Sequence, residues 1–86
     1  MPKTVWKYAA PLGTFEHLMP EGTQVLTAAM QGEDGQMWAL VDPAAPKINR
    51  RFEVTGTGHP VPDGARWIAA LQDPPFVWHV WEISDA

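Results

Sequence analysis

Nine prolines and seven glycines interrupt this chain of 86 residues. Proline removes a backbone donor and blocks helix interiors, and glycine supplies turn conformations that other residues avoid. Turn signals recur about every 8–12 residues, and helical periodicity is nowhere sustained over about ten residues. The sequence therefore predicts an all-β fold, a small antiparallel sandwich or partly open barrel of about six or seven short strands.

The expected strands are short alternating or apolar segments that lie between turn signals. The segment 24–31 is apolar on both faces, which predicts a central strand, and Gly32-Glu33-Asp34-Gly35 predicts the hairpin that follows it. The two prolines within residues 42–47 predict a loop, or a single helical turn that starts at Asp42. The complete set of expected strands is 4–9, 14–19, 24–31, 36–41, 50–57, 67–72 and 76–83.

Length and charge narrow the class of protein. A chain of 86 residues is expected to form one small domain, residues 1–86. Its net charge of −4 disfavours nucleic-acid binding, which needs a basic surface. Cysteine is absent, which suits a reducing cytoplasm, and neither a long apolar run nor a signal-like segment is present. We therefore expect a cytoplasmic protein without a membrane span.

Residues 50–62 hold the first candidate binding groups, Arg50 and Arg51. Adjacent arginines suit a phosphate or carboxylate, because the guanidinium group donates two parallel hydrogen bonds. In a strand, however, adjacent side chains point to opposite faces, so only one of them reaches a given site. The alternative is a solvated strand end, or an ion pair with Asp42 or Glu53.

Gly56 and Gly58 lie in the Gly-Thr-Gly-His-Pro segment that ends the same stretch. Their backbone amides are candidates for binding an anion, although a dinucleotide motif needs a third glycine and a following helix, and both are missing. The alternative is a bulge and a turn between strands. His59 precedes a proline and therefore has a restricted backbone. It is either a ligand contact or a loop hydrogen-bonding group, and the sequence leaves both open.

Groups for catalysis or metal binding are scarce. His17, His59 and His79 have no ligand at metal-binding spacing, and the single serine is Ser84, near the C-terminus. Without cysteine a thiol nucleophile is impossible. The acidic pair Glu33 and Asp34 lies at a hairpin tip, where carboxylates stay solvated. We therefore expect no enzyme activity, no metal and no cofactor.

Five tryptophans are many for one small core. Trp78 and Trp81 lie on opposite faces of the last strand, so at least one is expected outside the main core. An outward aromatic residue on an edge strand is a typical interface anchor, which predicts a homodimer through the C-terminal strand. The alternative is a second small core beneath the proline-rich loops. Trp38 is the candidate for stacking on a base or ring of a ligand.

A resemblance to a known family rests on blocks that keep their order over nearly the whole chain: Val5-Trp6-Lys7-Tyr8 with Pro11-Leu12, Trp38-Ala39-Leu40-Val41-Asp42-Pro43, Arg51-Phe52 with Gly56-Thr57-Gly58-His59-Pro60, and Val77-Trp78-His79-Val80-Trp81-Glu82. In these blocks the chain is similar to a family of short uncharacterised phage and bacterial proteins, although Trp78 and Trp81 replace an expected phenylalanine. The resemblance implies a phage or prophage setting and the cytoplasm of a bacterial host. It implies no catalytic residues.

These features predict a small phage-type binding protein, for example an anti-defence inhibitor. One version sequesters a small anionic signalling ligand with Arg50, Arg51, His59 and the amides of Gly56 and Gly58. The other binds a host protein through an acidic face and the outward tryptophans. The alternative function is a minor virion or accessory structural protein without a ligand.

Overall fold

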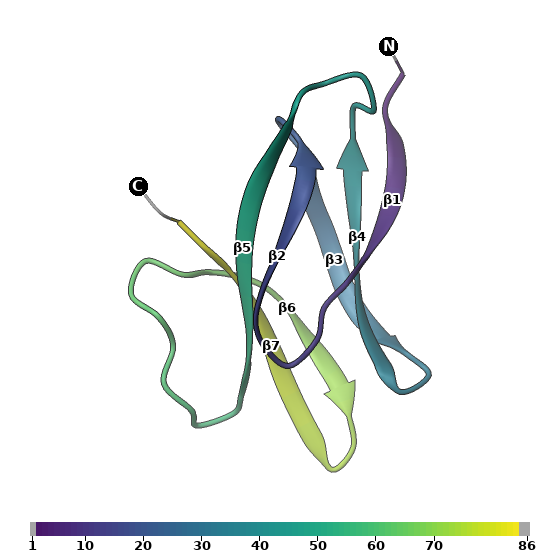
Figure 1. The fold of residues 1–86 in the computed structure, drawn as a ribbon. Helices are drawn as coiled ribbons and strands as arrows, with labels where there is room; N and C mark the ends of the chain where they lie inside the picture. The colour runs from purple at the N-terminus through teal and green to yellow at the C-terminus, as the bar shows by residue number, and fades with distance from the viewer. Residues whose placement is uncertain (1, 85–86) are drawn as a thin grey trace.

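The computed structural model describes residues 2–84, and their regular structure consists of strands alone (Figure 1). This confirms the predicted all-β fold and all seven strand positions to within a few residues. The strands are β1 (Thr4–Ala9), β2 (Gly13–Pro20), β3 (Gln24–Gln31), β4 (Asp34–Val41), β5 (Lys47–Gly56), β6 (Arg66–Asp73) and β7 (Phe76–Ile83).

The strands form two antiparallel sheets that pack face to face. One sheet has three strands in the order β1-β4-β3, and the other has four in the order β2-β5-β7-β6. The chain crosses between the sheets after β1, and β3 lies beside β6 where an edge of each sheet meets. The sheets are not joined into one hydrogen-bonded cylinder, so the fold is sandwich-like and not a closed barrel.

Two predictions of where a strand lies within its sheet, central or at an edge, are wrong. Residues 24–31 form an edge strand, because β1 occupies the other side of β4. A bulge between Val25 and Thr27 leaves Leu26 exposed. The C-terminal strand β7 is not an edge strand, since β5 and β6 pair with its two sides. Its backbone donors and acceptors are used within the chain, so a dimer cannot form by pairing along β7.

The core lies between the two sheets and follows the alternation of the strands. Phe52 and Val54 of β5 are buried, and the ring of Phe52 stacks on Phe15 at 5.4 Å between centroids. Phe15 and Leu18 are out of phase, and the structure shows that the face of Phe15 is the inner one while Leu18 is exposed. Each fully buried side chain of this size contributes roughly 1.5–3 kcal/mol to folding.

The connections are turns. At residues 42–47 the Asp42 carboxylate accepts a hydrogen bond from the Ala44 amide at 3.0 Å, and no helix forms. Of the two structures predicted there, the loop is therefore the one observed. The turn after Val61 closes with a hydrogen bond from the Ala65 amide to the Pro62 carbonyl at 3.2 Å. Gly64 then takes the third turn position with φ of 74°, a value that favours glycine.

Candidate functional site

The Gly-Thr-Gly-His-Pro segment closes the end of β5 with a tight turn. The His59 amide donates to the Gly56 carbonyl at 3.1 Å, and Gly58 takes a φ of 87°. A Cβ atom on Gly56 would lie 3.0 Å from the His59 ring and 3.2 Å from the Trp78 ring. Gly56 thus allows His59 to pack directly on the strand, and Gly58 supplies the backbone conformation.

An open depression of about 370 Å³, here called the outer hollow, lies beside this turn on the outer face of the four-stranded sheet. Trp67 and Trp81 are cross-strand neighbours there, and Trp67 is 51% exposed. The long connection between β5 and β6, visible in Figure 1 as a wide loop, provides the other wall. The lining residues are Thr55, Gly56, Thr57, Gly58, His59, Val61, Trp67, His79 and Trp81.

Hydrogen bonds fix the polar edges of the rings in the outer hollow. The Trp67 indole Nε1 donates to His79 Nδ1 at 3.3 Å. Neutral His79 therefore carries its proton on Nε2, which lies 3.1 Å from the Thr57 hydroxyl. That hydroxyl in turn donates to the Val77 carbonyl at 3.0 Å. The chain of donors and acceptors is complete, which leaves the ring faces as the available binding surface.

Trp81 is fixed in the same way. Its indole Nε1 donates to the Thr55 hydroxyl at 3.0 Å, and Thr55 is itself buried. Both tryptophans of the hollow are thus held in orientation by side chains of the sheet. A surface held in this way loses little conformational entropy when a partner covers it.

A second depression of about 500 Å³, the side hollow, lies on the other side of His59. Here Phe76 stacks on Trp78 with 5.3 Å between ring centroids, and Phe76 is largely exposed. Because His59 lines both depressions, Trp81 and Trp78 lie on either side of it. The two tryptophans predicted as interface residues are therefore both next to the candidate site.

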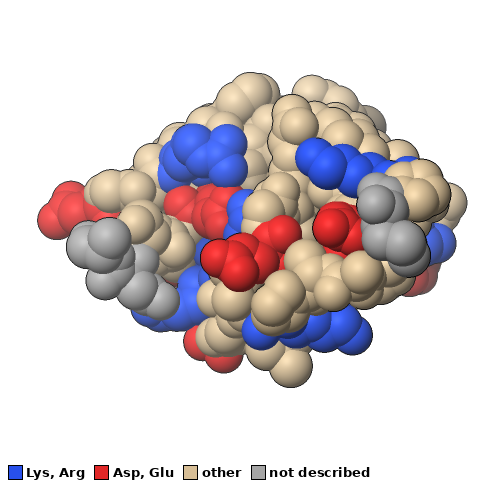
Figure 2. Space-filling model, turned by 90° about the horizontal axis from the view of Figure 1, so that it is seen from above, with Lys and Arg blue, Asp and Glu red and all other residues tan. Residues whose placement is uncertain are grey.

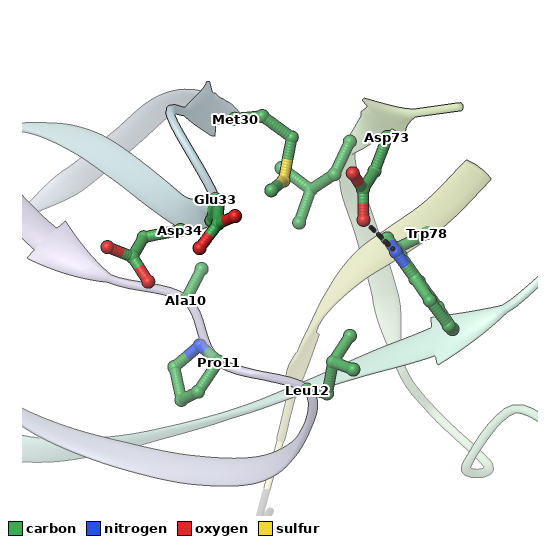
Figure 3. Close-up of a pocket in the computed structure, with 10 residues that line it drawn as sticks. Ala10, Pro11, Leu12, Met30, Glu33, Asp34, Asp73 and Trp78 are labelled. Atoms are coloured by element: carbon green, nitrogen blue, oxygen red, sulfur yellow. Dashed lines mark hydrogen bonds between the residues drawn. The ribbon is translucent and has the colours of Figure 1, made fainter. Parts of the chain in front are cut away.

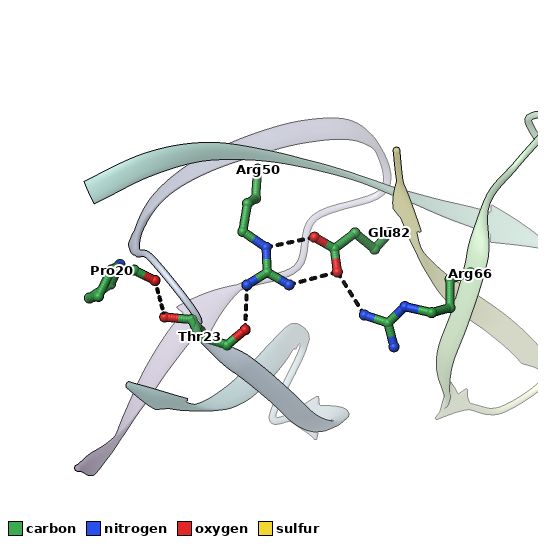
Figure 4. A network of polar contacts seen from close by, with 5 residues as sticks. All are labelled: Pro20, Thr23, Arg50, Arg66 and Glu82. Atoms are coloured by element: carbon green, nitrogen blue, oxygen red, sulfur yellow. Dashed lines mark hydrogen bonds and ion pairs between the residues drawn. The ribbon is translucent and has the colours of Figure 1, made fainter. Parts of the chain in front are cut away.

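Arg50 does not lie at this site but on the inner face of β5, among core residues. Its Nε and Nη2 atoms contact the two carboxylate oxygens of Glu82 at 2.6 and 2.7 Å, and its Nη1 donates to the Thr23 carbonyl (Figure 4). Arg66 binds the same carboxylate at 2.8 Å. For Arg50 the predicted alternative of an ion pair with Asp42 or Glu53 is wrong, because its partner is Glu82 of β7.

Two pKa values are shifted, one within this network and one beside it. Burial raises the pKa of Glu82, but hydrogen bonds and positive charge from Arg50 and Arg66 outweigh it, so the pKa lies below the ordinary value of 4.5. Burial raises the pKa of Tyr8 above 10.0, and the charge of Arg50 opposes this only in part. The Tyr8 hydroxyl is buried without a hydrogen-bond partner among the described residues. The network joins β5, β6 and β7 of the four-stranded sheet to the turn that precedes β3, and its charged groups are occupied by one another.

Arg51 and Trp38 also lie away from His59. Arg51 points to the outer face of β5, where its Nε is 3.6 Å from Glu16. Trp38 lies on the outer face of the other sheet, between Lys7 and Thr27. Of the six predicted binding residues, the structure brings together Gly56, Gly58 and His59 only.

Trp67 is the tryptophan of the outer hollow that the sequence did not single out. In the β6–β7 hairpin, the residues next to the turn pair in regular register, Asp73 with Phe76 and Ala70 with His79. The same count would place Trp67 opposite Glu82. A bulge between Trp67 and Ala69 shifts the register, so Trp67 faces Trp81 instead. A one-residue bulge gives no sequence signal here, and the tryptophan pair therefore appears only in the structure.

Within residues 2–84 no three histidine or acidic side chains lie close enough to hold a metal ion. The same part of the chain contains no helix that could cross a membrane. On the face seen in Figure 2, acidic and basic side chains are interspersed, and no patch of one sign dominates. This face thus shows no basic track of the kind that nucleic-acid backbones require.

The geometry defines a small antiparallel β-sandwich with two aromatic depressions around one histidine. Among protein families, residues 1–86 match the model described as "Domain of unknown function (DUF7352)". The chain belongs to this family, which confirms the expected membership of an uncharacterised family. Searches of curated proteins and of solved structures found no match.

Proposed function

We propose that the protein is a non-enzymatic binding module that holds a partner protein against the outer hollow and the side hollow. One observation carries this proposal: Trp67 remains 51% exposed although it stands beside Trp81 in a formed depression. Tryptophan buries roughly 150–250 Å² when covered and is enriched among residues that dominate interface energies. Hydrogen bonds from Trp67 to His79 and from Trp81 to Thr55 hold the two rings in a fixed orientation for such a contact.

The exposure of the hollow argues against a second small core beneath the loop. In a core the loop residues would cover the rings and lose contact with water. Val61 is instead 41% exposed and His59 is exposed as well. The depression is therefore better explained as a surface that a partner completes.

The contacts of the arginines favour a protein partner over a small anionic ligand. Arg50 is committed to Glu82 and Thr23 inside the sandwich, and Arg51 lies near Glu16 on a different part of the sheet. Neither lines the hollows around His59. An anion there would meet one histidine and backbone amides, in a protein of net charge −4. An apolar or aromatic side chain of a protein fits the tryptophan walls better.

The proposal extends to the origin of the protein and the cell in which it acts. The resemblance to phage and bacterial proteins suggests a phage-borne inhibitor that binds a host protein in the bacterial cytoplasm, as an anti-defence protein does. The blocks that carry this resemblance include residues that line the two hollows: Gly56, Thr57, Gly58, His59, Trp78 and Trp81. The structural-protein alternative has no separate support in the geometry.

Affinity capture from a lysate of uninfected bacteria tests the proposal. The wild type is compared with Trp67→Ala, and Trp38→Ala is the matched control, since Trp38 lies on the other sheet. We expect a specific host protein to bind the wild type and the control, and to bind Trp67→Ala with an affinity about 30-fold lower, the effect of an interface hot spot. Equal binding by all three variants, or no specific host protein, would contradict the proposal.

A further inference from the structure

A third depression, here called the end cavity, lies at one end of the sandwich (Figure 3). It has a volume of about 260 Å³ and forms where the β3–β4 hairpin, the β6–β7 hairpin and the segment after β1 meet. None of its lining residues belongs to the outer hollow. It shares Trp78 with the side hollow but none of its other lining residues, so it is a distinct depression.

Backbone contacts give the cavity a defined shape. The Ala10 amide donates to the Gly35 carbonyl at 2.9 Å, which ties the segment after β1 to the β3–β4 hairpin. A Cβ atom on Gly35 would lie 2.5 Å from the Ala10 carbonyl oxygen and 3.0 Å from Leu71. The glycine thus permits a close approach that holds these walls in place.

The walls combine carboxylates with apolar and aromatic surface. Figure 3 shows Glu33 and Asp34 on one side, and Asp73 with Trp78 on the opposite side. Asp73 Oδ2 accepts a hydrogen bond from the Trp78 indole at 3.1 Å. No ion pair within residues 2–84 involves any of the three carboxylates. Their negative charge is therefore not compensated from inside the described chain.

The volume of the end cavity and the chemistry of its lining side chains indicate the kind of ligand that fits. The three carboxylates do not form a metal-binding group within the described residues. The volume of about 260 Å³ is below the range of about 300–1,000 Å³ that is usual for drug-sized ligands. Apolar walls such as Leu12 and Met30 suit an aliphatic stem, and an indole ring beside carboxylates suits an organic cation.

We propose that the end cavity binds the side chain of an arginine or lysine from a partner protein. The stem lies against Leu12 and Met30, and the cationic group lies between the two sets of carboxylates and near the Trp78 ring. Charge complementarity carries this assignment, because carboxylates face the cavity from both sides and no described cation pairs with them.

Nuclear magnetic resonance titration with N-acetyl-arginine amide tests the proposal, with N-acetyl-citrulline amide as the uncharged probe of the same shape. We expect the arginine probe to shift the Trp78 indole signal saturably, with an affinity on the order of millimolar that weakens at high salt. The citrulline probe should cause no saturable shift. Equal shifts by both probes, or no saturable shift by the arginine probe, would overturn the proposal.

Substitutions of the three carboxylates test whether the arginine probe binds in the end cavity. Glu33→Gln with Asp34→Asn changes two exposed side chains, and Asp73→Asn keeps an oxygen acceptor for the Trp78 indole. The triple variant should bind the arginine probe at least about fivefold more weakly. Glu21→Gln with Asp63→Asn, two exposed charges outside the cavity, should bind as the wild type does. Unchanged binding in the triple variant would contradict the site. If that variant fails to fold, the exposed Glu33→Gln and Asp34→Asn pair gives the same test.

Discussion

Each face of the four-stranded sheet carries an exception to the usual division of residue types. On the inner face a charged pair, Arg50 and Glu82, is only 15% and 16% exposed, and both groups have several partners. On the outer face the apolar rings of Trp67 and Trp81 line an open depression. Satisfied polar groups thus lie inside the fold, while unused apolar surface lies outside. We infer that the inner face determines stability and that the outer face is available for binding.

The largest effect should come from the inner pair. Arg50→Ala leaves the carboxylate of Glu82 with Arg66 alone and removes the bond to Thr23, so we expect unfolding free energy to fall by about 3 kcal/mol. Arg51→Ala is the matched control, because its 38% exposed side chain lies 3.6 Å from Glu16, and it should cost less than about 1 kcal/mol. Urea unfolding measures both. Similar losses for the two variants would show that the faces do not differ in this way.

The free energy of unfolding should fall at acid pH because Glu82 becomes protonated. Because folding lowers the pKa of Glu82 below 4.5, its ionised form stabilises the protein above that pH. This stabilisation is lost as pH falls through the lower pKa of the folded state. In Glu82→Gln that part of the pH dependence should be absent. Unfolding curves recorded at a series of pH values below 5 measure it, and an unchanged pH profile in the variant would exclude Glu82 as its source.

The stability of the turn beside His59 should depend on the backbone conformation of Gly58 more than on side-chain contacts. Gly58 has a φ of 87° and open space around it. Gly58→Ala should therefore cost about 1–2 kcal/mol, the cost of a left-handed conformation for a residue with a Cβ atom. Gly64→Ala, with a φ of 74° and similar open space, is the control and should cost about as much. Thermal unfolding compares them, and no loss in either variant would contradict this reason for the glycines.

The smallest effect concerns a buried hydroxyl of the three-stranded sheet, that of Tyr8 in β1. The hydroxyl of Tyr8 is buried without a partner among the described residues. Removing it in Tyr8→Phe should leave stability unchanged or raise it by up to about 1 kcal/mol. Chemical unfolding measures this, and a clear loss of stability would mean that the hydroxyl has a partner in solution.

The sequence predicts much of this fold because alternation and turn residues act locally. The Gly32-Glu33 turn joins β3 and β4 where expected, and Phe52 and Val54 face the core as their spacing indicates. Long-range pairing has no such signal. The contact of Arg50 with Glu82 depends on β5 and β7 being neighbours, and the approach of Trp67 to Trp81 depends on a bulge. Because the order of the strands has no local signal, the sequence alone does not predict which residues meet at the site.

The most direct test of this account is the stability of Trp67→Ala measured by urea unfolding. If the outer hollow is a binding surface, the ring is held by one hydrogen bond and is only half buried, and unfolding free energy should fall by less than about 2 kcal/mol. A loss of about 3 kcal/mol or more, typical of a buried tryptophan, would show instead that Trp67 belongs to a second core. The first result agrees with the division between the faces, and the second contradicts it.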